Sequence, residues 1–367
     1  MHKRIWGFVV LAVWLASGAR AADLELKTEK LAEGVYLFRA PSDLDLWTAT
    51  NSVAIVNDQD VTVFDSNTRS GTARMVIAEI RKLTSKPVRM LINSHWHMDH
   101  WSGNDEYVKA FPGIQIIATM ETRDYMARMT SGFFADSLNA NVTRMKTALD
   151  EAVKTGKQAD GTALTDAIRR EKEKEIAETA SFAKEVAGLP RVLPNLVFRD
   201  TLTFWSGKRE FRLFTATGDA TGCAVLYLPA EKILVTGDVF VRPESGEGPP
   251  PWTTNSYSIT PWLASLRQFE AMDAAVIVPG QGPAQHDKAS LKLTAAAFAA
   301  IIDQVHAALE RGVFRLDDVQ AAVNVDAIGV QFTPGASAPS EGFKRWVSIV
   351  VRKVVQESLD GVIRGGA

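Results

Sequence analysis

Residues 89–104 read RMLINSHWHMDHWSGN, in which a short apolar run leads directly into a cluster of histidines. The run at 89–93 predicts a buried strand, and His95, His97, Asp99 and His100 follow at its end. Because the backbone turns where a strand ends, side chains two and four positions apart can converge on one point. Imidazole nitrogens and carboxylate oxygens are ligands for zinc and related divalent ions. The chain has only six histidines, so three within six consecutive residues predict a metal site rather than a chance surface cluster.

The segments around this motif predict an α/β protein built from two similar halves. In the first half, β-type runs at 34–38, 52–56 and 61–64 precede a helical pattern at 72–83. In the second half, strand patterns between 196 and 235 and at 276–278 precede a helical pattern from 289 onward. Two such halves packed face to face predict a four-layer αββα sandwich, with helices outside two inner sheets.

The stretch from about residue 121 to 190 has no β-type run and is rich in Ala, Glu, Lys and Arg. It predicts a helical insert, and its mixed charge run RREKEKE at 169–175 is typical of a solvated face. We expect one domain over 22–300 that contains this insert, followed by a helical C-terminal extension over 301–367. The insert could act as a lid or as the contact of a homo-oligomer, and the sequence leaves both open.

Composition excludes several classes of protein. The chain has 367 residues, of which 46% are hydrophobic and 23% charged, as in a globular protein with a sizeable core. A formal net charge of −2 argues against a nucleic-acid partner, which favours a basic surface. Cys223 is the single cysteine, so an internal disulfide and a Cys-rich zinc site are both excluded.

Residues 1–21 have the pattern of a secretory signal peptide. A short basic start is followed by an apolar stretch, and small residues stand at Ala19 and Ala21, where a signal peptidase requires them. We therefore expect an exported protein, most simply a periplasmic one, with no stable membrane anchor after cleavage. We expect no later segment to be long and apolar enough to cross a membrane.

The His-x-His-x-Asp-His motif after a strand, followed by WSGN at 101–104, resembles the signature of the metallo-β-lactamase-fold hydrolase superfamily. Three later segments resemble further motifs of that family, in the expected order. They are TGDATG at 217–222, the predicted hairpin at 226–240 that ends with Gly237-Asp238, and VPGQGP at 278–283. The resemblance covers about residues 30–300, interrupted by the insert, and it implies the same αββα fold.

The resemblance also implies a metal-ligand set. A first ion would be held by His95, His97 and Asp219, and a second by Asp99, His100 and Gln281, with Asp238 bridging both. The family has histidine where this chain has Asp219 and Gln281. Aspartate is a competent zinc ligand, whereas the neutral amide oxygen of glutamine suits zinc poorly. Zinc is the ion that the resemblance favours, while the added carboxylate shifts preference toward Mn²⁺ or Fe, and the site could bind two ions, one or none.

The implied activity is hydrolysis of a small-molecule ester, lactone, amide or phosphoester by a metal-bound hydroxide, with Asp99 as the catalytic residue that orients the water. The alternative is a non-catalytic, metal-impaired member of the fold that acts as a binding protein, as the changes at 219 and 281 suggest. Aromatic residues around the Pro-rich loop could wall a substrate pocket, or could simply pack against the core. These candidates are Trp252, Tyr257 and Trp262, together with Trp47.

Overall fold

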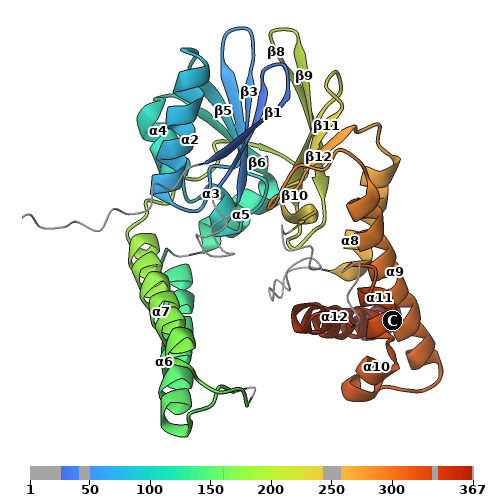
Figure 1. Cartoon of the computed structure of the whole chain (residues 1–367). Coiled ribbons are helices and arrows are strands. Elements are labelled where there is room, and N and C mark those ends of the chain that lie inside the picture. Colours follow the sequence, from blue (N-terminus) through green and yellow to red (C-terminus); the bar gives the residue numbers. More distant parts are fainter. Residues whose placement is uncertain are drawn as a thin grey trace, which may run out of the picture.

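Two β-sheets face each other at the centre of the protein (Figure 1). The computed structural model describes residues 26–40, 50–129, 131–159, 161–242, 258–332 and 338–365. The first sheet has seven strands in the order β1-β2-β3-β4-β5-β6-β7, and the second has five in the order β12-β11-β10-β9-β8.

The first sheet follows the chain order closely. Its strands are β1 (Lys27–Ala32), β2 (Val35–Arg39), β3 (Asn51–Val56), β4 (Val61–Phe64), β5 (Val88–Ile92), β6 (Gln115–Thr119) and β7 (Leu196–Phe198). The first four pair antiparallel, and β4 to β7 pair parallel. Parallel neighbours require crossover connections, and these are supplied by α2 (Ser70–Leu83) before β5 and by α3 (Met98–Trp101) and α4 (Asn104–Ala110) after it.

The second sheet is mainly an antiparallel meander. Its strands are β8 (Thr201–Ser206), β9 (Arg209–Ala216), β10 (Cys223–Leu228), β11 (Ile233–Val235) and β12 (Val276–Val278). Only the pair of β11 and β12 is parallel, and a 3₁₀ turn, η1 (Gly237–Val239), and α8 (Ile259–Ala271) lie between these two strands along the chain.

Apolar side chains pack on both faces of the central strands, and β3, β4, β10, β11 and β12 are almost wholly buried, whereas the edge strands β1 and β8 are partly exposed. The inner core joins the two sheets and includes Ile55, Phe64, Phe211 and Leu226. The outer face of the first sheet packs against α2 and α4, and that of the second packs against α8 and α9 (Ala289–Glu310). The expected four-layer αββα sandwich is therefore confirmed.

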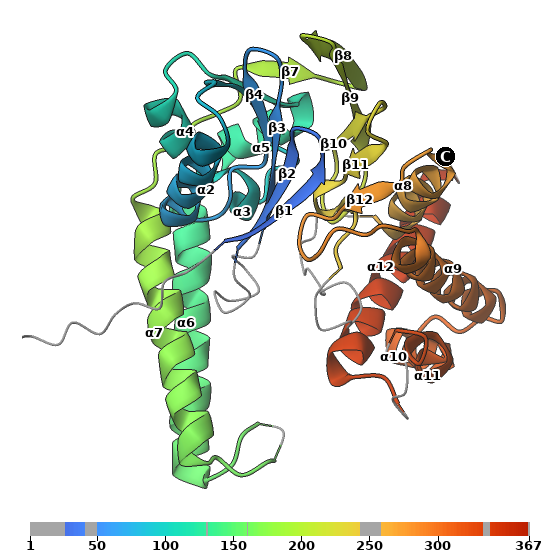
Figure 2. The same ribbon diagram turned by 45° about the horizontal axis from the view of Figure 1, so that its top comes forward.

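The expected helical insert consists of α5 (Met120–Arg128), α6 (Ser131–Thr155) and α7 (Asp166–Ala187), which connect β6 to β7. The last two form an antiparallel hairpin that extends away from the sheets (Figure 2). Its own small hydrophobic cluster contains Val142, Leu149 and Ile176. The hairpin is thus stabilised mainly by contacts between its two helices.

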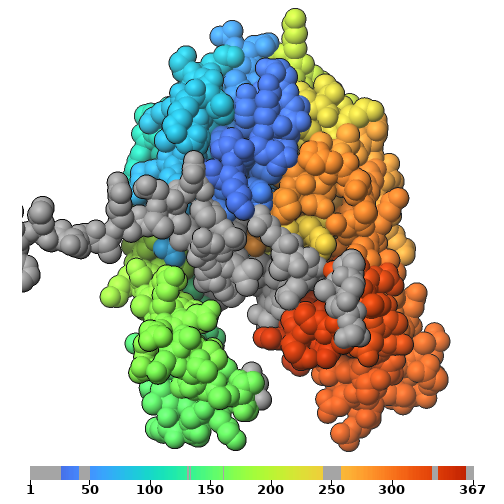
Figure 3. Space-filling view, viewed as in Figure 1, coloured from blue at the N-terminus to red at the C-terminus, as the bar shows by residue number. Residues whose placement is uncertain are grey.

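The C-terminal part of the chain is also helical, with α10 (Leu316–Ala322), α11 (Val325–Gly329) and α12 (Glu341–Gly365) after α9. The boundary expected at residue 300 falls inside α9, which contacts both α8 and α12. Phe298 of α9 packs against Trp346 of α12. The C-terminal helices therefore continue the layer that covers the second sheet, and they form a projection separate from the α6–α7 hairpin (Figure 3).

One expectation about membrane spans needs correction. Among the described residues, α9 is long and apolar enough to cross a membrane by length and composition alone. Its apolar side, including Leu291, Phe298, Ile301 and Val305, is buried against the rest of the protein. The sequence analysis did not identify α9 as a hydrophobic segment of this length, and its apolar side chains pack in the core of the fold.

Gly103 allows a close approach between the loop after β4 and the start of α4. A Cβ at this position would lie 2.1 Å from the Ser66 carbonyl oxygen and 2.7 Å from the Ala73 Cβ. We expect Gly103→Ala to lower the free energy of unfolding by about 1–3 kcal/mol, because the backbone would have to move. Urea unfolding followed by circular dichroism measures this change.

Gly71→Ala is the matched control, since Gly71 lies in the first turn of α2 and its Cβ would meet nothing closer than 4.0 Å. Helix propensity predicts that this change is neutral or stabilises the protein by up to about 1 kcal/mol. Equal stability of the two variants would contradict the close approach at Gly103.

Candidate metal centre

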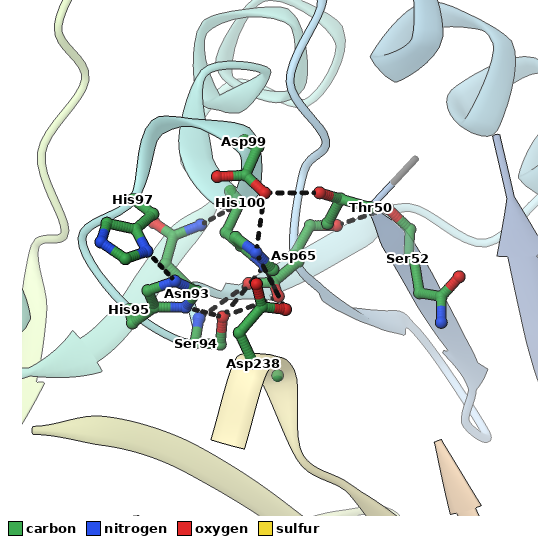
Figure 4. A network of polar contacts seen from close by, with 12 residues as sticks. Thr50, Ser52, Asp65, Asn93, Ser94, His95, His97, Asp99, His100 and Asp238 are labelled. Atoms are coloured by element: carbon green, nitrogen blue, oxygen red, sulfur yellow. Dashed lines mark hydrogen bonds and ion pairs between the residues drawn. The ribbon is translucent and has the colours of Figure 1, made fainter. Parts of the chain in front are cut away.

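The predicted ligands meet at one edge of the sandwich, between the two sheets. Those from the first sheet follow β5, either in the loop that precedes α3 or in α3 itself. Those from the second sheet lie after β9, in η1 after β11, and after β12. Strand ends at one edge of a sheet commonly supply site residues in α/β folds. Figure 4 shows the network that results, with side chains from both sheets.

His95, His97 and Asp219 form the first group of donors. His95 Nε2 lies 2.9 Å from His97 Nδ1, which lies 2.9 Å from Asp219 Oδ2. Asp219 Oδ1 lies 3.7 Å from His95 Nε2. Ligand atoms bound about 2.0–2.2 Å from a single ion lie roughly 3–3.5 Å from one another. The spacing of these three side chains therefore suits one shared ion.

Asp99, His100 and Asp238 form the second group. His100 Nε2 lies 3.1 Å from Asp99 Oδ2 and 3.4 Å from Asp238 Oδ1. Gln281 adjoins this group, with Nε2 3.3 Å from Asp99 Oδ2 and 3.1 Å from Asp238 Oδ2. The structure thus brings all seven predicted ligand positions together.

Several buried polar atoms at this edge are suited to a cation. His100 Nε2 and Asp238 Oδ1 are buried, and their contacts are with each other at 3.4 Å and, for His100, with Asp99 Oδ2 at 3.1 Å. One ligand atom from each of His95, His100 and Asp238 lies within 4.8 Å of the other two. Because buried polar atoms normally have partners, this arrangement fits a bound divalent ion.

Asp65 is a functional candidate that the sequence analysis missed. Its Oδ2 lies 2.7 Å from His100 Nδ1, and its carboxylate accepts hydrogen bonds from the Ser94 amide and hydroxyl at 2.7 and 2.8 Å. Ser94 Oγ lies 2.9 Å from His95 Nδ1, so the network reaches both groups of donors. Partners of this kind orient ligating histidines. Its position in the sequence could have identified it, because Asp65 directly follows the buried strand β4, and site residues often lie at strand ends.

The loop that carries Gln281 is fixed to the beginning of β3. The Asn51 side-chain amide donates to the carbonyls of Pro279 and Gly282 at 2.7 and 2.8 Å. Gly280 passes so close to the bridging position that a Cβ there would lie 1.9 Å from Asp238 Oδ1. The loop can therefore approach the site only with glycine at this position.

The loop that carries Asp219 is held by α5. The hydroxyls of Thr119 and Thr122 both donate to the Gly222 carbonyl, at 2.6 and 3.1 Å. Cys223 follows directly and is buried, with Sγ within 4.8 Å of ligand atoms of His95 and Asp219. Burial raises the pKa of this thiol. The single cysteine excluded a disulfide and a Cys-rich site, but its place in the sequence did not predict that the sulfur lies beside the ligands.

Burial and close charges perturb the titration of the site. Burial, with His100 and His97 nearby, holds the pKa of His95 well below its usual value. Burial alone would lower the pKa of His100, but the surrounding Asp99, Asp238 and Asp65 carboxylates outweigh it and hold that pKa well above its usual value. Burial raises the pKa of Asp238 to about 7. His95 is therefore neutral and able to ligate, whereas binding of a cation displaces protons from its neighbours.

The predicted substrate-binding aromatics are placed only in part. Trp47, Trp252 and Tyr257 lie outside the residues that the structure describes. Trp262 is 6% exposed in α8, where its ring packs against Phe298 and its indole nitrogen donates to the Val239 carbonyl at 2.7 Å. This placement agrees with the alternative in which the aromatic ring packs in the core.

A cavity of about 500 Å³ lies at the opposite ends of the strands. It is lined by residues of the turns between strands, among them Asn57, Asp58, Lys208 and Glu231. None of the predicted site residues lines it, so it is separate from the candidate metal centre.

Comparison with known proteins links the chain to one superfamily and to two alkylsulfatases. A linear primary-alkylsulfatase from Pseudomonas sp. (strain ATCC 19151) is 27% identical over 256 residues, which cover 68% of this chain and 45% of that protein. This chain therefore spans less than half the length of that relative. The structure of the stereoselective inverting sec-alkylsulfatase Pisa1 from Pseudomonas sp. matches with a TM-score of 0.58 and 16% identity, over 91% of this chain and 50% of that one.

A metallo-beta-lactamase from Pontibacter korlensis matches with a TM-score of 0.49 and 14% identity, over 75% of this chain and 99% of that one. The family model of the metallo-beta-lactamase superfamily matches residues 45–281, which include every predicted ligand position. The chain therefore belongs to the metallo-beta-lactamase superfamily.

Proposed function

We propose that this protein is an exported, metal-dependent hydrolase that cleaves sulfate esters of alkyl alcohols. The observation that carries the hydrolase assignment is the convergence of three histidines and three aspartates on one edge between the sheets, at ligand distances. The match to the linear primary-alkylsulfatase supports the sulfate-ester class. Sulfate esters were not among the substrate classes expected from the sequence, and they replace those classes in this proposal.

The protein's own residues divide the work of such a reaction. When water attacks sulfur, a new S–O bond forms and the ester S–O bond breaks. One water proton then goes to the alcohol oxygen, and the other leaves with hydrogen sulfate, which ionises to sulfate. His95, His97 and Asp219 would hold a divalent ion, which would supply Lewis-acid chemistry by polarising the ester and acidifying water. Asp99 is 16% exposed, against 0% for Asp219 and 2% for Asp238. Asp99 is therefore the carboxylate best placed to accept and return the proton.

Export is part of the same proposal and depends on residues 1–21, which lie outside the described structure. Their basic start, apolar stretch and final small residues support it. A homo-oligomer formed through the α6–α7 hairpin stays a prediction.

A non-catalytic binding protein is the second candidate. Its support is Gln281, whose amide contacts two carboxylates of the site where the family resemblance expects an imidazole. The ligand in that case is a small molecule held at the same edge of the sheets.

We expect the purified protein to release inorganic sulfate from octyl sulfate, a linear substrate short enough to be used below micelle formation. Dialysis against EDTA should abolish this release, and Zn²⁺ or Mn²⁺ should restore it, because the pocket residues alone do not polarise the ester. Ion chromatography of sulfate measures the reaction, with p-nitrophenyl acetate and bis(p-nitrophenyl) phosphate as comparison substrates.

Two outcomes would separate the candidates. Protein that holds metal but hydrolyses only a comparison substrate would contradict the sulfate-ester class. Protein that holds metal, binds octyl sulfate and hydrolyses nothing would favour the binding protein.

Asp65→Asn should weaken metal binding by about 10–100-fold, because Asn replaces an ionised acceptor that orients His100 and Ser94. Asparagine is the appropriate replacement, since Asp65 has φ 58° and Asn tolerates this left-handed backbone conformation. Competition with a fluorescent chelator measures the dissociation constant.

Asp58→Asn is the control, because Asp58 is exposed in the turn between β3 and β4. It should leave the dissociation constant unchanged. If Asp65→Asn also binds metal like the parent protein, Asp65 has no role in orienting the ligands.

A further inference from the structure

Gln281 contacts only the second group of donors at the candidate metal centre, through Asp99 and Asp238. We propose that the centre holds a single divalent ion on the His95 side, and that the carboxamide of Gln281 takes the place of a second ion beside Asp99 and Asp238. This inference rests on the metal binding proposed above, but it does not depend on any particular substrate.

The Gln281 side chain is fixed in its position. It is 6% exposed, and its backbone carbonyl accepts a hydrogen bond from the Arg242 amide at 3.1 Å. Gln281 forms an isolated antiparallel bridge with Thr50, and the adjacent Gly280 carbonyl accepts from the Asn51 amide at 2.8 Å. The backbone is therefore held on both sides of Gln281, and its buried side chain has little room to turn out of the pocket.

The nitrogen of the Gln281 amide must face the carboxylates. The facing atom lies 3.3 Å from Asp99 Oδ2 and 3.1 Å from Asp238 Oδ2. An amide oxygen at these distances would oppose two carboxylate oxygens, whereas the NH₂ group has two donors for two acceptors. The Thr50 hydroxyl also donates to Asp99 Oδ2, at 3.0 Å (Figure 4). Both oxygens next to Gln281 are therefore already satisfied by the protein.

The buried ligand atoms that the Gln281 amide does not contact belong to the other side of the pocket. Gln281 bonds Asp238 Oδ2, whereas Asp238 Oδ1 lies 3.4 Å from His100 Nε2. Ligand atoms of both residues lie within 4.8 Å of a ligand atom of His95. His97 Nδ1 adjoins His95 Nε2 at 2.9 Å. His95 therefore adjoins donors of both groups, whereas the Gln281 amide contacts only Asp99 and Asp238.

A second ion would have to break existing hydrogen bonds. To bind it, Gln281 would give up both N–H···O contacts and rotate to present a neutral amide oxygen. The protein ligands typical of zinc are thiolate, imidazole and carboxylate, so this exchange brings a poor ligand. The amide already supplies the partial positive charge that two neighbouring carboxylates need. The geometry therefore favours one ion over two.

The test is metal stoichiometry in the full-length protein. Apoprotein is titrated with Zn²⁺ by isothermal calorimetry, and the metal retained after desalting is measured by mass spectrometry. We expect one ion per chain for the parent protein and two for Gln281→His, because an imidazole can ligate a second ion beside Asp99 and Asp238. Gln285→His is the matched control, since Gln285 lies in the same loop and its amide donates to the Pro283 carbonyl. This control should stay at one ion.

A second measurement does not require the variant to fold. The parent protein loaded with Mn²⁺ should give the paramagnetic resonance spectrum of an isolated ion, whereas a coupled pair would overturn the inference. Two Zn²⁺ ions in the parent protein would overturn it too, but would leave the proposed hydrolase intact. A parent protein that binds no ion would overturn both. A folded Gln281→His variant that still binds one ion would contradict the role given to Gln281.

Discussion

Acidic and imidazole side chains are buried side by side where the two sheets meet. The need to pair these groups constrains the conformation of the surrounding loops. Buried charges are costly unless they are paired and hydrogen-bonded. Asp65, Asp219 and Asp238 are each 2% exposed or less, and they pair with His97 and His100. The centre is therefore held together by mutual neutralisation, and removal of one member leaves another charge without compensation.

The local backbone shows how strongly these contacts constrain the chain. Asp65 and Asn67 both adopt a positive φ at the end of β4, which is uncommon outside glycine. This geometry allows the Asp65 carboxylate to meet His100 and Ser94 together. Gly280 passes beside Asp238, and Thr119 with Thr122 holds the loop of Asp219. Strained or crowded positions cluster at functional sites for this reason.

Much of this arrangement could be predicted from the sequence because it depends on local patterns. The apolar run at 89–93 followed by His95, His97, Asp99 and His100 gave both a strand and a ligand cluster. The family resemblance then placed Asp219, Asp238 and Gln281, and the structure brings them to the same edge. What could not be predicted depends on contacts between distant residues. Asp65 and Thr50 are ordinary polar residues in the sequence, and only the pairing of strands brings Asp65 to His100 and Thr50 to Asp99.

The burial of Trp262 and of α9 has the same origin, because an apolar residue can line a pocket, a membrane or a core, and its neighbours decide which. A pattern of hydrophobic residues specifies that a surface is covered. It does not specify what covers it.

The contacts of Asn51 join parts of the chain that lie far apart in the sequence, since its partners Pro279 and Gly282 are 228 and 231 positions away. A ribosome therefore releases the histidine cluster long before it releases the residues that close around it. During synthesis those imidazoles face the surrounding solution without Asp219 or Asp238. The pocket is completed only when nearly the whole chain has folded, so the arrangement of these side chains is a property of the finished protein and is absent from the nascent one.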